Sequence, residues 1–232
     1  RKVLFTGCSC QIAGLKRFLK NDDANLICID LICHGVDSPK IWLDYLHSLF
    51  PNEPVIYVNL RDKITGQDNS SINIHGIKSM FSERGKDNIY FRSWQYDLFL
   101  RPSCEKCPFK KDNRVSDITI GDCWGFQTIA PEMYDDKGLS SLIVHSVKGK
   151  SLFEAIAPQL VFKETLLNDV KLYNSDYIRS QPFNSSKRAA FWKDYHKHKI
   201  PFSKLLEKHL GETKKQKILK LIKAVVKNVC HY

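Results

Sequence analysis

The sequence has no apolar run of the ~18 or more residues that a transmembrane helix needs. It also lacks the glycine-rich phosphate loop of nucleotide-binding proteins, the Gly-x-Ser-x-Gly turn of serine hydrolases and the His-Glu-x-x-His motif of zinc proteases. No internal repeat or low-complexity segment is present. Motifs therefore assign no catalytic residue, and a membrane-spanning helix is not expected.

An initiator methionine and a signal-peptide pattern are missing as well. The chain opens with Arg1 and Lys2 and runs at once into the strand-like residues 3–6. We therefore expect a fragment whose natural beginning lies upstream. A site shared with such an upstream region cannot be identified from these residues alone.

Composition indicates a globular protein. Of the 232 residues, 43% are hydrophobic and 26% charged, which is enough apolar material for a core. The net charge of +11 would suit nucleic acid, a membrane surface or an acidic protein, but much of the excess follows residue 186. The excess positive charge thus lies mainly near the end of the chain rather than at a binding site, and we do not expect nucleic-acid binding.

The eight cysteines are even in number, as in a disulfide framework, but their placement favours another use. Cys28 lies inside an apolar strand, Cys230 lies near the end of the chain, and the others stand beside Gly, His and Pro where elements end. This arrangement is typical of a reduced, cytoplasmic protein with a metal site.

The first third of the chain predicts a βαβ unit. Residues 3–6 and 26–33 have the apolar pattern of buried strands, with Asp30 the exception in the second. Between them lies a helix expected to carry Ile12, Leu15, Phe18 and Leu19 on one face. The strands of such a unit run parallel, so their carboxyl ends emerge at one edge of the sheet.

The rest of the chain predicts an α/β fold with an antiparallel insertion. Residues 38–50 read as a helix with Ser38 as its N-cap and Pro39 at its first position. Alternation over residues 55–62, 71–76 and 88–92 predicts antiparallel strands, and residues 94–100 predict a short helix. Further strands are expected at 117–122 and 139–147, then a turn at Lys148-Gly149-Lys150 into a helix over 151–157.

We expect an α/β fold whose mixed sheet contains the βαβ unit, with a helical, basic C-terminal tail. Two domains are predicted: an α/β domain over 1–160 that holds the cofactors, and a helical extension over 161–232.

Cys104-x-x-Cys107 is half of a metal site, because its short loop lets two sulfurs converge on one centre. The missing half is expected from Cys10 and Cys33, which follow the two strands of the βαβ unit and so share one sheet edge. Four thiols suit a Cys-ligated iron–sulfur cluster or a structural zinc ion, and spacing does not separate the two.

Several neighbours of this edge are further candidates. Cys8 and Cys123 stand close enough to replace a ligand, and His34 is a candidate ligand or a donor to a sulfur. Gly121-Asp122-x-Trp124-Gly125 combines an acid, a planar ring and two glycines at a strand end. Such a set can line a flat cofactor, although a tight turn with a core tryptophan explains it as well.

Residues 214–229 predict an amphipathic helix with a basic face. It would suit contact with a membrane surface or a partner, or docking on its own domain with the basic face solvated.

Four motifs, in this order, resemble the beta-subunit family of coenzyme F-420 hydrogenases and dehydrogenases, carboxyl-terminal domain. They are Gly7-x-x-Cys10-Gln11-Ile12-Ala13-Gly14-Leu15, Cys33-His34-Gly35-Val36-x-Ser38-Pro39, Arg101-Pro102-Ser103-Cys104-x-x-Cys107 and Arg114-x-Ser116-Asp117-Ile118-Thr119-x-Gly121-Asp122-x-Trp124-Gly125. The resemblance covers roughly residues 3–180.

The resemblance implies an iron–sulfur flavoprotein oxidoreductase. A flavin, FAD, would exchange a hydride with a deazaflavin or another small molecule and pass single electrons to a 4Fe-4S cluster and on to a redox partner or ferredoxin-like module. Cys10, Cys33, Cys104 and Cys107 match the family's cysteines, and Gly121, Asp122, Trp124 and Gly125 match the motif near the cofactors.

The chain departs from the family pattern in two places. Cys8 stands where members commonly have Thr, and the family's glycine-rich amino-terminal region is missing. Some members are associated with surface-polysaccharide synthesis, which would imply another substrate. A zinc-stabilised interaction module without catalytic activity is the competing hypothesis.

Overall fold

The computed structural model describes residues 1–20, 23–180, 183, 185–197 and 199–210. The chain forms two compact units of interleaved segments. The first comprises Arg1–Asp37, Asp62–Ser70 and Leu100–Pro182, and the second Ser38–Arg61, Ser71–Phe99 and Phe183–Tyr232. The predicted division into residues 1–160 and 161–232 stays a prediction.

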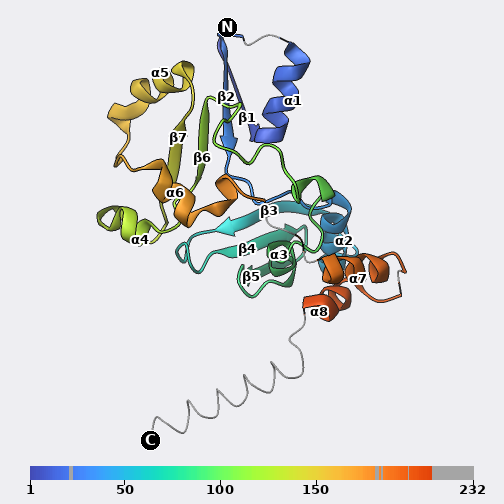
Figure 1. The fold of residues 1–232 in the computed structure, drawn as a ribbon. Helices are drawn as coiled ribbons and strands as arrows, with labels where there is room; N and C mark the ends of the chain where they lie inside the picture. The colour runs from blue at the N-terminus through green and yellow to red at the C-terminus, as the bar shows by residue number, and fades with distance from the viewer. Residues whose placement is uncertain (21–22, 181–182, 184, 198, 211–232) are drawn as a thin grey trace, which may run out of the picture. The chain divides into compact units, whose positions relative to one another are not determined.

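The first unit is built on a four-stranded sheet in the order β1-β2-β6-β7. These strands are β1 (Val3–Cys8), β2 (Leu26–Leu31), β6 (Ile118–Asp122) and β7 (Ser140–Val144). β1 and β6 both run parallel to β2, whereas β7 pairs antiparallel with β6. The mixed sheet with its βαβ unit is therefore confirmed, and three strands point their carboxyl ends to one edge (Figure 1).

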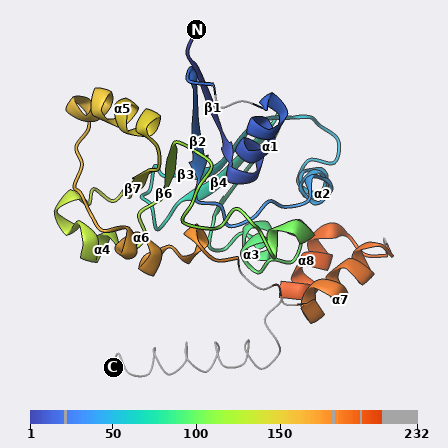
Figure 2. The same ribbon diagram turned by 45° about the horizontal axis from the view of Figure 1, so that its top comes forward.

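Helix α1 (Ser9–Leu19) connects β1 to β2 and packs along both, as two views show (Figure 1 and Figure 2). Ile12 forms a small core with Leu26 and Cys28 of β2. The predicted face was wrong for Phe18 and Leu19, which are 82% and 42% exposed. Six residues at 100° each place Phe18 about a third of a turn away from Ile12.

The other helices of the first unit are short. They are α4 (Phe126–Ile129), α5 (Val147–Ile156), α6 (Leu167–Tyr173) and the 3-10 turns η1 (Pro102–Cys104), η2 (Pro131–Met133), η3 (Ala157–Gln159) and η4 (Ser175–Tyr177). The turn predicted at Lys148-Gly149-Lys150 was wrong, because these residues lie inside α5. The Ser146 hydroxyl accepts the Gly149 N–H at 3.0 Å and so caps the helix earlier than expected.

The second unit contains the antiparallel insertion, a three-stranded sheet in the order β3-β4-β5. Its strands are β3 (Val55–Asp62), β4 (Ser71–Gly76) and β5 (Met80–Arg84), and its helices are α2 (Pro39–Leu49), α3 (Ile89–Gln95), α7 (Ser185–Tyr195) and α8 (Phe202–Leu210). Two of the expected strands are confirmed, but the one at 88–92 was wrong. Asn88 is instead the N-cap of α3, its side chain accepting the Phe91 N–H at 2.9 Å.

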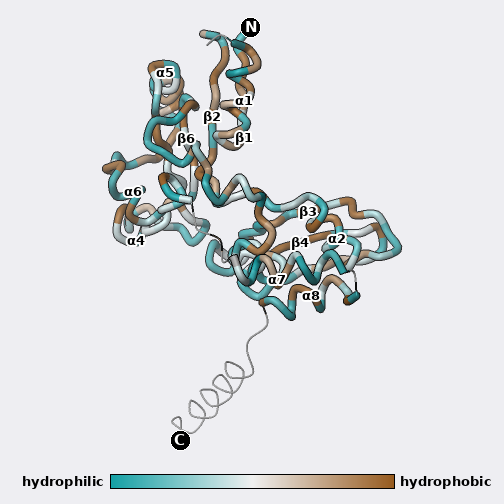
Figure 3. The backbone as a smooth tube through the Cα atoms, turned by 45° about the vertical axis from the view of Figure 1, so that its right-hand side comes forward, coloured by the Kyte–Doolittle hydropathy of each residue, from teal (hydrophilic) through white to brown (hydrophobic). Residues whose placement is uncertain are grey.

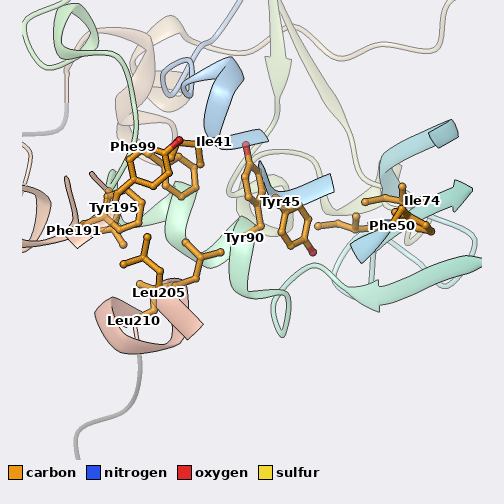
Figure 4. Packing of buried hydrophobic residues seen from close by; sticks show 13 residues of the cluster. Ile41, Tyr45, Phe50, Ile74, Tyr90, Phe99, Phe191, Tyr195, Leu205 and Leu210 are labelled. Atoms are coloured by element: carbon orange, nitrogen blue, oxygen red, sulfur yellow. The ribbon is translucent and has the colours of Figure 1, made fainter. Parts of the chain in front are cut away.

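The core of the second unit is aromatic. The rings of Tyr45 and Tyr90 stack with centroids 4.7 Å apart, and Phe191 lies among Phe99 and Tyr195 (Figure 4). α8 completes this core with its leucines, while its charged residues alternate with them along the helix (Figure 3).

None of the helices in the described part of the chain is long and apolar enough to cross a membrane. The amphipathic helix predicted over residues 214–229 and Cys230 lie outside the described residues.

Candidate metal centre

The predicted thiols gather at the carboxyl edge of the parallel strands of the first unit. β1 ends at Cys8, directly before the first turn of α1, which contains Cys10. Cys33 follows two residues after the end of β2. Since the two strands pair in parallel, with Cys8 opposite Leu31, these cysteines share one edge as expected.

Direct interactions link Cys8 with Cys33. A hydrogen bond from the Cys33 thiol lowers the pKa of Cys8 to about 6, although burial and the charge of Asp30 oppose the shift. The same hydrogen bond, together with burial, raises the pKa of Cys33. Cys8 is therefore the thiol of this pair that ionises first.

Cys10, Cys104 and Cys107 extend the group. Partial burial raises the pKa of Cys10, and the charges of Cys8 and Cys107 raise it further, so these three thiols lie within electrostatic range. The charge of Cys104 acts on Cys33 in the same way. All four predicted cysteines are thus connected, and Cys8 is a fifth thiol among them.

Backbone amides and a hydroxyl fix the Cys104–Cys107 loop. The Val36 N–H donates to the Sγ of Cys104 at 3.5 Å, and the Cys107 N–H donates to the Ser180 hydroxyl at 3.0 Å. Gly35 permits the close approach, since a Cβ there would stand 2.7 Å from Leu100 and 3.5 Å from the Cβ of Cys104. N–H groups aimed at sulfur are the usual surroundings of a thiolate ligand.

A buried cation lies beside Cys33. The Lys110 side chain is 6% exposed, and its Nζ donates to Asp176 at 2.8 Å and to the His34 carbonyl at 3.1 Å. The charge of Lys110 acts to lower the pKa of Cys33, against the larger opposing effects. Lys110 is therefore a fixed positive charge at this edge that favours thiolate, and the charge of Arg101 acts on Cys8 in the same direction.

His34 points to an acid. Its Nδ1 lies 3.0 Å from Asp176. Burial raises the pKa of Asp176, but the hydrogen bonds from His34 and Lys110 outweigh burial and leave that pKa lowered. The predicted role of His34 as a ligand or as a donor to a sulfur stays a prediction.

A buried polar network, which the sequence did not predict, lies under the cysteines. Asp30 is fully buried in β2 and accepts hydrogen bonds from the hydroxyls of Ser9 and Thr119. Arg114 donates to Ser9 at 2.7 Å and lies 3.4 Å from Asp30. The signals in the sequence were Asp30, a charge in an otherwise apolar strand, and Arg114 and Thr119, which belong to the fourth family motif.

The glycines of residues 121–125 accommodate neighbouring side chains. A Cβ on Gly121 would meet Ile32 at 2.8 Å, and Gly125 has φ +79° beneath the ring of Tyr173. The backbone carbonyl of Asp122 accepts a hydrogen bond from Asn174 at 3.1 Å. Trp124 is 44% exposed and so is not a core residue. The cofactor contacts predicted for these residues stay predictions.

The five thiols are not arranged around one ion. Among the described residues, no three His, Cys, Asp or Glu side chains are close enough together to hold a metal ion.

Two comparisons with known proteins bear on this site. The model of one protein family, the C-terminal region of the beta subunit of coenzyme F420 hydrogenase/dehydrogenase, matches residues 1–169. A search of curated proteins finds no match to the chain.

Proposed function

This chain belongs to the coenzyme F420 hydrogenase/dehydrogenase beta-subunit family, and we propose that it is the cluster-binding part of an iron–sulfur flavoprotein oxidoreductase. The observation that carries the proposal is the gathering of cysteines from three distant segments at one sheet edge. These thiols come from residues 8–10, 33 and 104–107 and interact with one another. Cys28, by contrast, packs in the core of the first unit.

The donor set fits an iron–sulfur cluster in its chemistry. Cys10, Cys33, Cys104 and Cys107 would hold the group, with Cys8 or Cys123 as a thiol able to replace one of them. Soft thiolates are the ligands that such clusters take. The match to a family of hydrogenases and dehydrogenases supports a redox-active cluster over zinc, which has no redox chemistry.

The cluster, when bound, would supply one-electron transfer that a hydride carrier alone cannot provide. The chain's own residues would hold and tune the site. The Val36 N–H, which points at the Cys104 sulfur, stabilises negative charge there. Lys110 adds a buried positive charge beside Cys33, which makes accepting an electron more favourable.

The flavin would lie next to Trp124 and Asp122. Support for this part of the proposal comes from the exposed ring of Trp124 at the end of β6, whose edge also carries the cysteines. FAD would exchange a hydride with a deazaflavin or another small molecule, and the cluster would pass electrons to a redox partner protein. Free thiols of this kind require a reducing compartment, so we propose a cytoplasmic location.

Purification without oxygen tests the proposal. We expect a brown protein with broad absorption in the blue part of the visible spectrum, iron and sulfide in equal amounts, and an EPR signal after reduction. Serine variants of Cys10, Cys33, Cys104 and Cys107 should lose iron, whereas Cys28→Ser, in the core of the same unit, should retain it. A colourless protein with stoichiometric zinc would contradict the proposal and leave a zinc-stabilised interaction module.

A further inference from the structure

Ser9 stands between Cys8 and Cys10, and its side chain reaches into the interior of the first unit. The residue is 5% exposed. Its hydroxyl donates to the Oδ2 of Asp30 and accepts from the Nη1 of Arg114 at 2.7 Å. The turn at Cys8 and Cys10 is thus connected to β2 and to the loop before β6 through the single side chain of Ser9.

The two partners of Ser9 are themselves fixed. Their side chains are 0% exposed for Asp30 and 1% for Arg114, and they form an ion pair at 3.4 Å. Thr119 of β6 donates to the other oxygen of Asp30. A buried charge pair with all these hydrogen bonds has little freedom to move, because any displacement leaves a charge unpaired in the interior.

Arg114 is held from its far side as well. Its Nη2 donates to the Tyr177 carbonyl, and its guanidinium lies 4.5 Å from the centre of the Tyr177 ring. The guanidinium therefore has one orientation, and the position of Ser9 follows from it.

The other contacts of the cysteine turn act on Cys8 rather than on Cys10. The Cys8 N–H donates to the Gln11 side chain at 2.8 Å, a bond within the turn that fixes its shape but not its place. Cys10 itself is exposed. Strand pairing and the Cys33 hydrogen bond hold Cys8, and the tie through Ser9 extends this hold into the first turn of α1, which contains Cys10.

We propose that Ser9, Asp30 and Arg114 form a buried clamp that positions Cys8 and Cys10 relative to Cys33 in the thiolate site. The contacts of the clamp stand independently of the proposed function. Its effect on cluster binding rests on the proposed function. The three are positioning residues, since they act on the thiols through the turn.

Ser9→Ala is the sharpest test, because it removes the tie and leaves the Asp30–Arg114 pair in place. In the cluster-free protein, hydrogen–deuterium exchange of the amides of residues 8–13 should become about tenfold faster, as expected for losing hydrogen bonds to charged groups. Ser93→Ala is the matched control: Ser93 is also buried and donates to the Ile89 carbonyl at 2.7 Å, but in the second unit. It should leave residues 8–13 unchanged.

The reduction potential and EPR signal of the reconstituted protein would not change if Ser9 only stabilised the fold. Ser9→Ala should shift the reduction potential and broaden the EPR signal, and Ser9→Thr, which restores a hydroxyl, should return both towards the unaltered protein. Unchanged exchange and an unchanged potential in Ser9→Ala would overturn the clamp. If the unaltered chain takes up no cluster, the proposed function fails, and exchange alone still decides the clamp.

Discussion

Each cysteine of the first unit has its chemistry set by the atoms next to it. Cys28 is fully buried beside Ile12 and Leu26 and behaves as a small apolar residue. Cys104 instead faces a backbone N–H, and Cys8 accepts a hydrogen bond from Cys33. The same residue type therefore serves the core at one position and a reactive edge at the others.

His145 shows the same dependence on surroundings. Its Nε2 lies 2.8 Å from the Thr119 hydroxyl, which in turn donates to Asp30, so the histidine is the donor in this pair. Burial lowers the pKa of His145, the charge of Arg114 lowers it further, and the charges of Asp30 and Asp117 oppose the shift. The imidazole is therefore held neutral.

A pH dependence of stability follows from His145. A histidine with a lowered pKa binds fewer protons in the folded than in the unfolded chain, so its contribution to stability is lost as the pH falls below about 6.5. We expect His145→Gln, whose amide can still donate to Thr119, to flatten the decline of the unfolding free energy between about pH 7 and pH 5. Urea unfolding at several pH values measures this slope.

The control for this prediction is His47→Gln, on the exposed side of α2. It should leave the slope as it is in the unaltered chain. A His145→Gln slope equal to that of the unaltered chain would show that His145 is not held neutral by the fold.

Capping decides where helix α3 of the second unit begins. Asn88 is fully buried and makes three side-chain hydrogen bonds, accepting from the Phe91 N–H and donating to the Tyr45 hydroxyl at 2.8 Å and to Glu83 at 2.9 Å. The five residues 88–92, which begin with Asn88, were predicted to form a strand. The cap, which depends on side chains from α2 and β5, settles the matter.

Removing this cap should destabilise the protein. We expect Asn88→Ala to lower the unfolding free energy by about 1–3 kcal/mol, because it loses a cap and leaves buried partners unpaired. Ser38→Ala is the comparison, since Ser38 is an N-cap whose side chain makes no capping hydrogen bond, and its loss should be below about 0.5 kcal/mol. Chemical denaturation measures both, and equal losses would contradict the role of Asn88.

On the scale of the whole molecule, each unit has a core of its own. The core of the second unit brings α2, α3, α7 and α8 together with its sheet, and the core of the first unit lies between α1 and β2. The cysteine edge belongs entirely to the first unit. The two cores are thus separate targets for mutation.

Leu206 tests the larger core. It is fully buried in α8. Leu206→Ala should lower the unfolding free energy by about 2–5 kcal/mol through lost burial and a cavity. The fluorescence of Trp42, Trp94 and Trp192, which pack against this core, reports the transition. Leu43→Ala, at a 52% exposed position of α2, should change the unfolding free energy by less than about 0.5 kcal/mol. A loss as large as that of Leu206→Ala would contradict the assignment of the core.

The sequence alone determined the βαβ unit, the family resemblance and the edge at which Cys10 and Cys33 lie, because apolar periodicity and the handedness of parallel connections act locally. It did not determine the partners across the fold. The contact of Cys8 with Cys33, the charge of Lys110 beside them and the clamp of Ser9, Asp30 and Arg114 join residues up to 105 positions apart. Tertiary packing decided these, since it alone sets which buried charges meet.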